Sequence, residues 1–187
     1  MEVLEFRKIK TSDRFDTKYE AWSRIYEYPL VLDIIKKYYK SNDISLHNSS
    51  WGFTGCHVTF KEEIDSLYPN CIHSDILKSN LEKTKVWDIT TTPDTNWIEN
   101  FDVVINISTL EEVNFDHVNI FHNLYKQVKP GGILICTFDI PGLQVNNFES
   151  LFNKTIDRFD NELNNHNSKT PAFSGRNLEC GLMVIRK

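Results

Sequence analysis

The sequence predicts one α/β domain, a three-layer sandwich in which helices cover both faces of a mostly parallel sheet. Short apolar runs typical of strands alternate along the chain with segments of helical periodicity, and this order indicates a parallel sheet wound with helices. The 187 residues are enough for one domain that buries most of its apolar surface without disulfides or metals. We therefore expect a single domain over residues 1–187.

Each element is predicted from the spacing of its apolar residues. The strand candidates are residues 44–47, 71–76, 85–89, 101–108, 132–138 and 181–187. The helix candidates are residues 58–67, 114–128 and 148–159. Pro130-Gly131-Gly132 is a stop signal for the second of these helices. An Asn-rich polar stretch with Pro171 and Gly175 precedes the last strand, and we interpret it as an exposed loop or hairpin.

The N-terminal stretch carries apolar and aromatic residues at roughly helical spacing between residues 13 and 40. Proline lacks an amide hydrogen, so Pro29 favours two short helices or one kinked helix. We interpret residues 1–40 as an N-terminal helical segment.

Composition excludes several classes of protein. A formal net charge of −5 argues against nucleic-acid binding, which needs a basic face. The four cysteines are widely separated, with no Cys-x-x-Cys pair and no nearby run of histidines, so we expect reduced thiols and neither a disulfide framework nor a metal site. No apolar run approaches the ~20 residues that cross a bilayer, and the N-terminus lacks the apolar core of a signal peptide. We expect a cytoplasmic protein with no membrane partner.

Residues 101–138 carry a resemblance to a known family. They read FDVVINISTLEEV, then an amphipathic helix, then LYKQVKPGGILICTF. A fourth strand opened by Phe-Asp, a helix, a Lys-Pro-Gly-Gly turn and a fifth strand occur in this order in the class I methyltransferases that depend on S-adenosyl-L-methionine (SAM), which this segment resembles. The resemblance implies a Rossmann-like fold with an antiparallel last strand, SAM as cofactor and S-adenosyl-L-homocysteine (SAH) as product.

The cofactor loop departs from the pattern of that family. In the family the first strand runs into GxGxG, where the missing side chains let the backbone approach the cofactor. Here the strand ISLH runs into NSSWG, so Asn48 and Ser50 replace the first two glycines and only Gly52 remains. A second register, with Gly52 and Gly55 flanking a bulged turn, stays open. The resemblance implies that Asn48, Ser50, Trp51 and Gly52 contact the cofactor.

Two acidic residues at strand ends match further cofactor positions of the family. Asp75 lies roughly 20 residues beyond the loop, where an acidic side chain binds the ribose hydroxyls. Asp88, with Ile89, matches the position beside the adenine. The alternatives are that Asp75 caps the next turn and that Asp88 starts a surface turn.

The methionine part of the cofactor is matched by residues of the fourth strand and of the N-terminal segment. By resemblance, Asn106 and Ser108 line it, and Asn106 in particular would be an unusual core residue because a buried amide needs partners. The aromatic stretch from Tyr19 to Tyr28 resembles the N-terminal helices that shape the cofactor and acceptor pocket. Arg24 within it is expected to hold the SAM carboxylate or to stack on a sugar or ring. The alternative is an aromatic helix face packed on the sheet.

Candidates for a catalytic base follow the fourth and fifth strands, whose loops overlie the methyl group of the cofactor in this fold. They are Glu111, Glu112, Asp116, His117 and Asp139. The alternative for each acid is a solvated helix start or turn. The spacing of these residues has no metal signature, and we interpret His47 as a hydrogen-bonded structural histidine.

The sequence therefore predicts a SAM-dependent methyltransferase that acts on a small-molecule or carbohydrate acceptor, more at oxygen than at nitrogen or carbon. The alternative is a catalytically inactive fold of the same type that binds a ligand or partner, because Asn48 and Ser50 replace glycines. A nicotinamide-dependent enzyme is disfavoured because the sequence lacks GxGxxG near its first strand.

Overall fold

The computed structural model describes residues 1–10, 12–19, 23–50, 52, 55–140, 142–156 and 179–187. Within them the strands are β1 (Glu2–Lys8), β2 (Leu46–Ser49), β3 (Cys71–Asp75), β4 (Thr84–Val86), β5 (Phe101–Ile107), β6 (Val128–Ile140) and β7 (Glu179–Arg186). The helices are α1 (Arg24–Tyr38), α2 (Cys56–Leu67), α3 (His117–Gln127) and α4 (Val145–Phe152), with short 3-10 turns at Thr17–Tyr19 and Thr95–Trp97.

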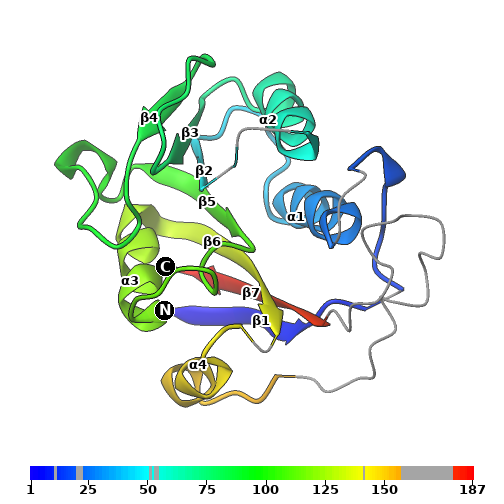
Figure 1. Ribbon diagram of the computed structural model, residues 1–187, viewed down its shortest axis with the longest axis vertical. Helices are drawn as coiled ribbons and strands as arrows, with labels where there is room; N and C mark the ends of the chain where they lie inside the picture. Colours follow the sequence, from blue (N-terminus) through cyan, green and yellow to red (C-terminus); the bar gives the residue numbers. More distant parts are fainter. Residues whose placement is uncertain (11, 20–22, 51, 53–54, 141, 157–178) are drawn as a thin grey trace.

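The described strands form one sheet in the order β1-β7-β6-β5-β2-β3-β4. The pairs from β6 to β4 are parallel, whereas β7 runs antiparallel to both β6 and β1. The predicted parallel sheet and its antiparallel last strand are confirmed. The two chain ends lie side by side as β1 and β7 at one edge of the sheet (Figure 1).

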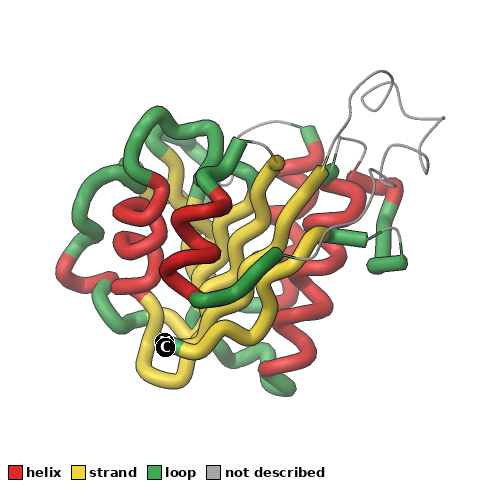
Figure 2. Tube along the Cα trace, turned by 90° about the horizontal axis from the view of Figure 1, so that it is seen from below, coloured by secondary structure: helices red, strands yellow, loops and turns green. Residues whose placement is uncertain are grey.

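Helices cover both faces of this sheet, as Figure 2 shows. On one face α1 and α2 bury a cluster that includes Ile25, Ile35 and Phe60 against the sheet. On the other face α3 and α4 bury Phe121 and Phe148 in a second cluster. The three layers follow from helices that each present one apolar stripe to the sheet. None of the described helices has both the length and the apolar character needed to span a membrane.

The N-terminal segment differs from the expectation of a helix over residues 1–40. Glu2–Lys8 is an edge strand that pairs with β7, and the helix begins at Arg24. Pro29 lies inside α1 instead of dividing it. The carbonyl that a helical residue 29 would use belongs to Ile25, and this oxygen accepts a hydrogen bond from the Asp16 amide at 2.7 Å. Because that carbonyl has another donor, the missing amide hydrogen of Pro29 does not leave the Ile25 oxygen unsatisfied.

Several element boundaries also differ from those predicted. The first strand is Leu46–Ser49 instead of 44–47, so Asn48 belongs to the strand and not to the loop. Helix α3 ends at Gln127, and β6 begins at the next residue and runs through the Pro-Gly-Gly sequence. Gly132 is required there because a Cβ would come within 2.7 Å of the Asp102 carbonyl oxygen. Trp22, residues 157–159 of the predicted helix and the Asn-rich loop lie outside the described residues.

Candidate functional site

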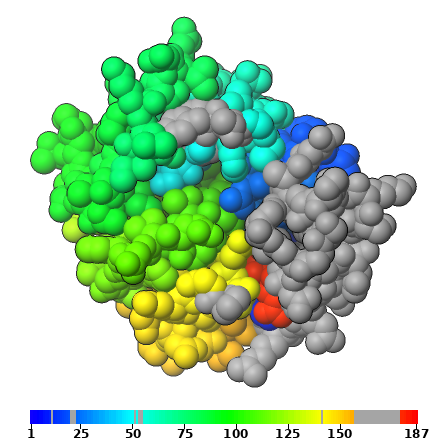
Figure 3. All heavy atoms as spheres, in the orientation of Figure 1, coloured from blue at the N-terminus to red at the C-terminus, as the bar shows by residue number. Residues whose placement is uncertain are grey.

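A cavity of about 220 Å³ opens at the carboxyl ends of β2 and β5, beside the start of α1. Its lining residues are Arg24, Tyr28, Asn48, Ser50, Gly52, His57, Phe60, Asp75, Ile107, Ser108 and Thr109. The space-filling view shows this face hollowed between α1, in blue, and the green segment that follows β5 (Figure 3). Ligands of open α/β sheets bind at this edge, where the strand order reverses.

A second cavity of about 310 Å³ adjoins the first at the carboxyl ends of β3 and β4. Its lining residues are Ser50, Asp75, Ile76, Trp87, Asp88, Ile89, Thr90, Thr109 and Val113. Ser50, Asp75 and Thr109 line both cavities. The two cavities therefore form one elongated site with a polar part beside α1, a more apolar part beside β4, and the Asp75 side chain at the junction.

The loop after β2 keeps a glycine-like backbone although it has lost glycines. Ser50 has φ +56°, in the left-handed region, and Gly52 and Gly55 also have positive φ. An L-residue in that region costs about 1–2 kcal/mol. A Cβ on Gly52 would lie 2.9 Å from the ring of His57. Ser50 thus takes the backbone conformation of a glycine, whereas Asn48 lies in regular strand; Trp51 is outside the described residues.

Asp75 and Asp88 accept hydrogen bonds within turns and also line the cavities. Asp75 Oδ1 accepts from the Leu77 amide at 3.1 Å, while Oδ2 faces the Gly52 amide at 3.4 Å. Asp88 Oδ1 accepts from the amide and the hydroxyl of Thr90 at 2.9 and 2.8 Å. Ile89 is buried and lines the second cavity next to Asp88. The predicted cofactor position and the predicted turn are therefore compatible for both acids.

Arg24 and Glu27 form a buried ion pair beside the first cavity. Glu27 is fully buried; Oε1 accepts from Ser108 Oγ at 2.5 Å, and Oε2 accepts from Ser23 Oγ at 2.6 Å and from Arg24 Nη1. Burial acts to raise the pKa of Glu27, but the Arg24 charge and these hydroxyl donors lower it overall. Burial likewise acts to lower the pKa of Arg24, yet Glu27 raises it. Both groups therefore stay charged at neutral pH. The negative charge of Glu27 partly offsets the positive charge that Arg24 presents to the cavity.

Tyr28, His57 and Phe60 form the aromatic wall of the first cavity. The Tyr28 ring stacks on Phe60 with centroids 4.0 Å apart, and its hydroxyl hydrogen-bonds His57 Nδ1. Burial, followed by the charge of Arg24, lowers the pKa of His57. The imidazole is therefore neutral at pH 7. His57 and Glu27 are not among the predicted site residues; the available signals were a histidine two residues after a loop glycine and an acid three residues after Arg24 in an apolar helix.

Glu111 and Asp139 come together from the segments that follow β5 and end β6. Glu111 Oε1 accepts from the Asp139 amide at 2.6 Å, and Oε2 is buried with no hydrogen-bond partner among the described residues. Burial raises the pKa of Glu111 to about 8, and burial followed by the Glu27 charge raises the pKa of Asp139. Neither side chain lines the two cavities. The raised pKa of Glu111 suits acid–base chemistry near neutral pH.

The remaining predicted residues lie in different surroundings. Glu112 is exposed, and Asp116 caps α3 by accepting from the amides of residues 118 and 119. His117 is buried, with Nδ1 accepting from the Gln144 amide at 3.2 Å. Asn106 is buried in β5 and lines neither cavity. These four residues are not brought to the cavities.

His47 is a structural histidine, as the sequence predicts. Its ring is fully buried, with Nδ1 2.6 Å from Gln127 Oε1 and Nε2 2.7 Å from Ser74 Oγ. Burial lowers the pKa of His47 to about 3, so the ring is neutral. It contacts Trp87, Trp97 and Phe101 on the face of the sheet covered by α3.

Comparison with known proteins identifies the fold. No protein-family model matches the sequence, and no curated protein sequence matches it. Among solved structures, the [4+2]-cyclase SpnF superposes with a TM-score of 0.60 and 11% identity, over 97% of this chain and 87% of that chain. The CMeT domain of the citrinin polyketide synthase gives 0.58 and 11%, over 90% and 55%. The trans-methyltransferase CalH, in complex with SAH, gives 0.53 and 13%, over 89% and 57%.

These similarities confirm the predicted Rossmann-like fold of the class I methyltransferases. This chain spans little more than half the length of the polyketide synthase domain and of CalH. At such identities the likeness shows the fold alone, because one fold hosts many activities.

Proposed function

We propose that this protein is a SAM-dependent methyltransferase that transfers a methyl group to a small-molecule or carbohydrate acceptor. The observation that carries the proposal is the pair of adjoining cavities at the carboxyl ends of β2 to β5, with Asp75 at their junction. A ligand with a polar amino-acid end, a ribose and a planar base matches that order of surfaces. The fold shared with CalH, which was solved with SAH, also supports it.

The residues that line the two cavities fit the parts of SAM in the order in which those parts are joined. Asp75 would accept from the ribose hydroxyls, and Asp88 from the exocyclic amine of adenine, with Ile76 and Ile89 against the ring. Arg24 would attract the carboxylate at the other end. Its pairing with Glu27 makes this attraction weaker than that of a lone arginine. The left-handed backbone at Ser50 lets the chain approach the ligand where glycine is usual.

The chemistry proposed for the chain's own residues is positioning and proton removal. When bound, SAM supplies the activated methyl group. Glu111 is the proposed base, because Oε2 has no partner within the described residues and its pKa of about 8 lies near the working pH. Glu111 lines neither cavity, so this role requires its side chain to turn toward the first cavity, where Oε2 would accept the proton of an acceptor hydroxyl. Such a base favours methylation at oxygen.

The alternative is a protein that binds a ligand with this fold and does not transfer methyl groups. Ser50 in place of a glycine and the pairing of Arg24 with Glu27 favour it. The similarity to SpnF also supports this alternative. SpnF shares this fold over nearly the whole chain but is named a [4+2]-cyclase and not a methyltransferase.

Calorimetry with SAM and SAH tests the proposal. We expect the wild type to bind both, and Asp75→Asn to bind SAH about 10-fold or more weakly, because it loses a charged hydrogen-bond acceptor. Glu112→Gln, which changes an exposed acid outside the cavities, is the matched control and should bind as the wild type. Absence of binding to either ligand by the wild type would overturn the enzyme assignment. Binding of SAH without methyl transfer to any hydroxylated acceptor would favour the alternative.

A further inference from the structure

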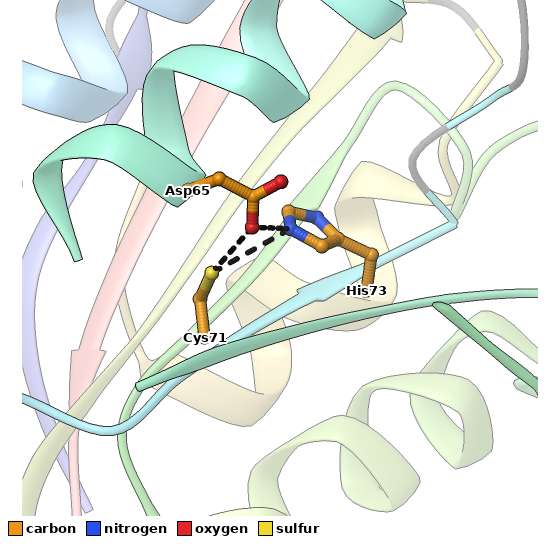
Figure 4. A group of neighbouring side chains, drawn as sticks. All are labelled: Asp65, Cys71 and His73. Atoms are coloured by element: carbon orange, nitrogen blue, oxygen red, sulfur yellow. Dashed lines mark hydrogen bonds and ion pairs between the residues drawn. The ribbon is translucent and has the colours of Figure 1, made fainter. Parts of the chain in front are cut away.

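Three metal-binding side chains converge away from the cofactor cavities. Asp65 lies in the last turns of α2, and Cys71 and His73 lie two residues apart on β3, so their side chains point to the same face of the sheet. Figure 4 shows Asp65 reaching down from the helix toward the other two side chains. Cys71 and His73 are buried, and Asp65 is about a quarter exposed. The group joins the end of α2 to β3.

The distances between the donor atoms match those around a tetrahedral zinc ion. Cys71 Sγ lies 3.6 Å from His73 Nε2 and 3.0 Å from Asp65 Oδ1, and His73 Nε2 lies 3.2 Å from the same oxygen. Zn–S bonds of about 2.3 Å and Zn–N or Zn–O bonds of about 2.1 Å at tetrahedral angles place donors roughly 3.4–3.6 Å apart. An ion therefore needs shifts of only about half an ångström.

The surroundings already orient these donors. Lys61 Nζ lies 2.5 Å from Asp65 Oδ2, which leaves Oδ1 toward Cys71 and His73. Asn48 Nδ2 lies 3.1 Å from His73 Nδ1, so an amide group already stands beside the ring nitrogen that a ligating histidine uses as a hydrogen-bond donor. Lys83 Nζ lies 3.4 Å from Asp65 Oδ1 and opposes a cation there, but its side chain is about a third exposed and can turn to solvent.

We propose that Asp65, Cys71 and His73 bind a Zn²⁺ ion, with water as the fourth ligand. Binding forms bonds to Cys71 Sγ, His73 Nε2 and Asp65 Oδ1. The thiol proton leaves to solvent, and the imidazole proton moves from Nε2 to Nδ1. Asn48 then turns its amide oxygen to accept from Nδ1, since the amide orientation is not fixed by shape. The thiolate and the carboxylate balance the charge of the ion.

The proposed zinc site is separate from the cofactor cavities but is linked to the first of them by one residue. Cys71 begins β3, whereas Asp75 at the cofactor cavity ends it. Asn48 contacts His73 and also lines the first cavity. The ion would therefore hold α2 against β3 and fix the Asn48 amide. Sequence spacing does not predict the site, because Asp65 comes from a different element and Cys-x-His alone is no zinc motif.

Cobalt titration of the chelator-treated protein tests the proposal directly. We expect one equivalent of Co²⁺ to give a thiolate-to-cobalt charge-transfer band that Zn²⁺ abolishes. The band should be lost in Cys71→Ser and retained in Cys136→Ser, a matched control because Cys136 is equally buried but belongs to the other face of the sheet. An absent band in the wild type, or an equal band in Cys71→Ser, would overturn the site.

Affinity for Zn²⁺, measured by competition with a chromophoric chelator, keeps the test valid if Cys71→Ser fails to fold. Asp65→Asn should bind about 10-fold or more weakly. Lys83→Gln should bind about 5-fold more tightly, because one opposing charge is removed. Unchanged affinity in Asp65→Asn, or weaker binding in Lys83→Gln, would contradict the assignment. SAH binding is not the readout, so failure here leaves the proposed function standing.

Discussion

The two helical layers that flank the sheet bury different kinds of side chain. Under α3 and α4, the rings of Phe121, Phe148 and Phe152 pack on one another with centroids 5.5–5.8 Å apart. Under α1 and α2, the buried groups include the ion pair of Arg24 with Glu27 and the group around His73. The α3–α4 layer is held by apolar packing and by neutral polar pairs such as His47 with Gln127, whereas the α1–α2 layer, which we call the polar layer, also holds the charged pair of Arg24 with Glu27.

This difference separates what stabilises the domain from what serves its site. Apolar packing tolerates substitutions of similar volume, whereas a buried charge is tolerated only with its partner. The first cavity and the proposed zinc site adjoin the polar layer. Variants of paired groups should therefore affect stability and binding together.

The largest expected effect is the loss of the Glu27 carboxylate. Glu27→Ala leaves Arg24, whose side chain is only 14% exposed, without its partner, and removing one member of a buried pair costs about 3–5 kcal/mol of unfolding free energy. Urea denaturation measures it. Glu27→Gln, which keeps the shape and a hydrogen-bond acceptor, should cost less. If Glu27→Ala changes the free energy of unfolding by under about 1 kcal/mol, the polar layer does not depend on this pair.

The next effect is a dependence of stability on pH through Glu111. Its pKa is about 8 in the folded protein against an ordinary value of 4.5, so the folded state holds a proton that the unfolded state has released. The stability that this proton provides is complete below pH 4.5 and is lost as the pH rises through 8. Glu111→Gln should flatten the unfolding free energy between pH 5 and 9.

Activity should show the opposite dependence on pH from stability. If Glu111 is the base, methyl transfer in the wild type rises as the pH approaches 8, and Glu111→Gln lacks this rise. Glu112→Gln, which changes the exposed neighbour, is the control for both measurements. An unchanged profile of stability in Glu111→Gln would contradict the buried environment of Glu111.

A smaller effect distinguishes the two glycines that precede α2. Both have positive φ, but an added Cβ meets the His57 ring only at Gly52, and nothing lies within 4 Å of it at Gly55. Gly55→Ala should cost about 1–2 kcal/mol from the backbone alone. Gly52→Ala should cost more and should also weaken SAH binding, because it displaces a wall of the first cavity. Equal SAH affinities in the two variants would show that Gly52 does not contribute to the SAH site.

The sequence predicts the helices and strands better than the tertiary contacts between them, for a physical reason. Helical and strand periodicity reports which side chains face the sheet, so α3, β3 and β5 are found close to their observed bounds. Strand β1 is missed because it is a charged edge strand whose partner β7 lies at the other end of the sequence. Glu27 and the zinc ligands are missed because their partners are set by tertiary contacts and not by spacing.

The residues of the cofactor site are predicted only in part. Asp75 and Asp88 are found at the cavities because strand ends recur at regular distances in this fold. Asn106 and His117 are expected in or near the site but are buried elsewhere, because successive side chains alternate between the faces of a strand and turn around the axis of a helix. Spacing therefore predicts the position along the sheet, and contacts decide which side chain enters the cavity.

The smallest predicted effect concerns Ser50, where sequence and backbone disagree. The residue is not glycine but has φ +56°. Ser50→Gly removes the strain of a left-handed L-residue but adds freedom to the unfolded chain, so the net gain in stability should be about 1 kcal/mol or less. If the serine is retained only by neutral drift, SAH binding should be unchanged or tighter. If binding weakens while stability rises, the hydroxyl itself contacts the ligand, and the loop of this protein has exchanged a glycine for a polar contact.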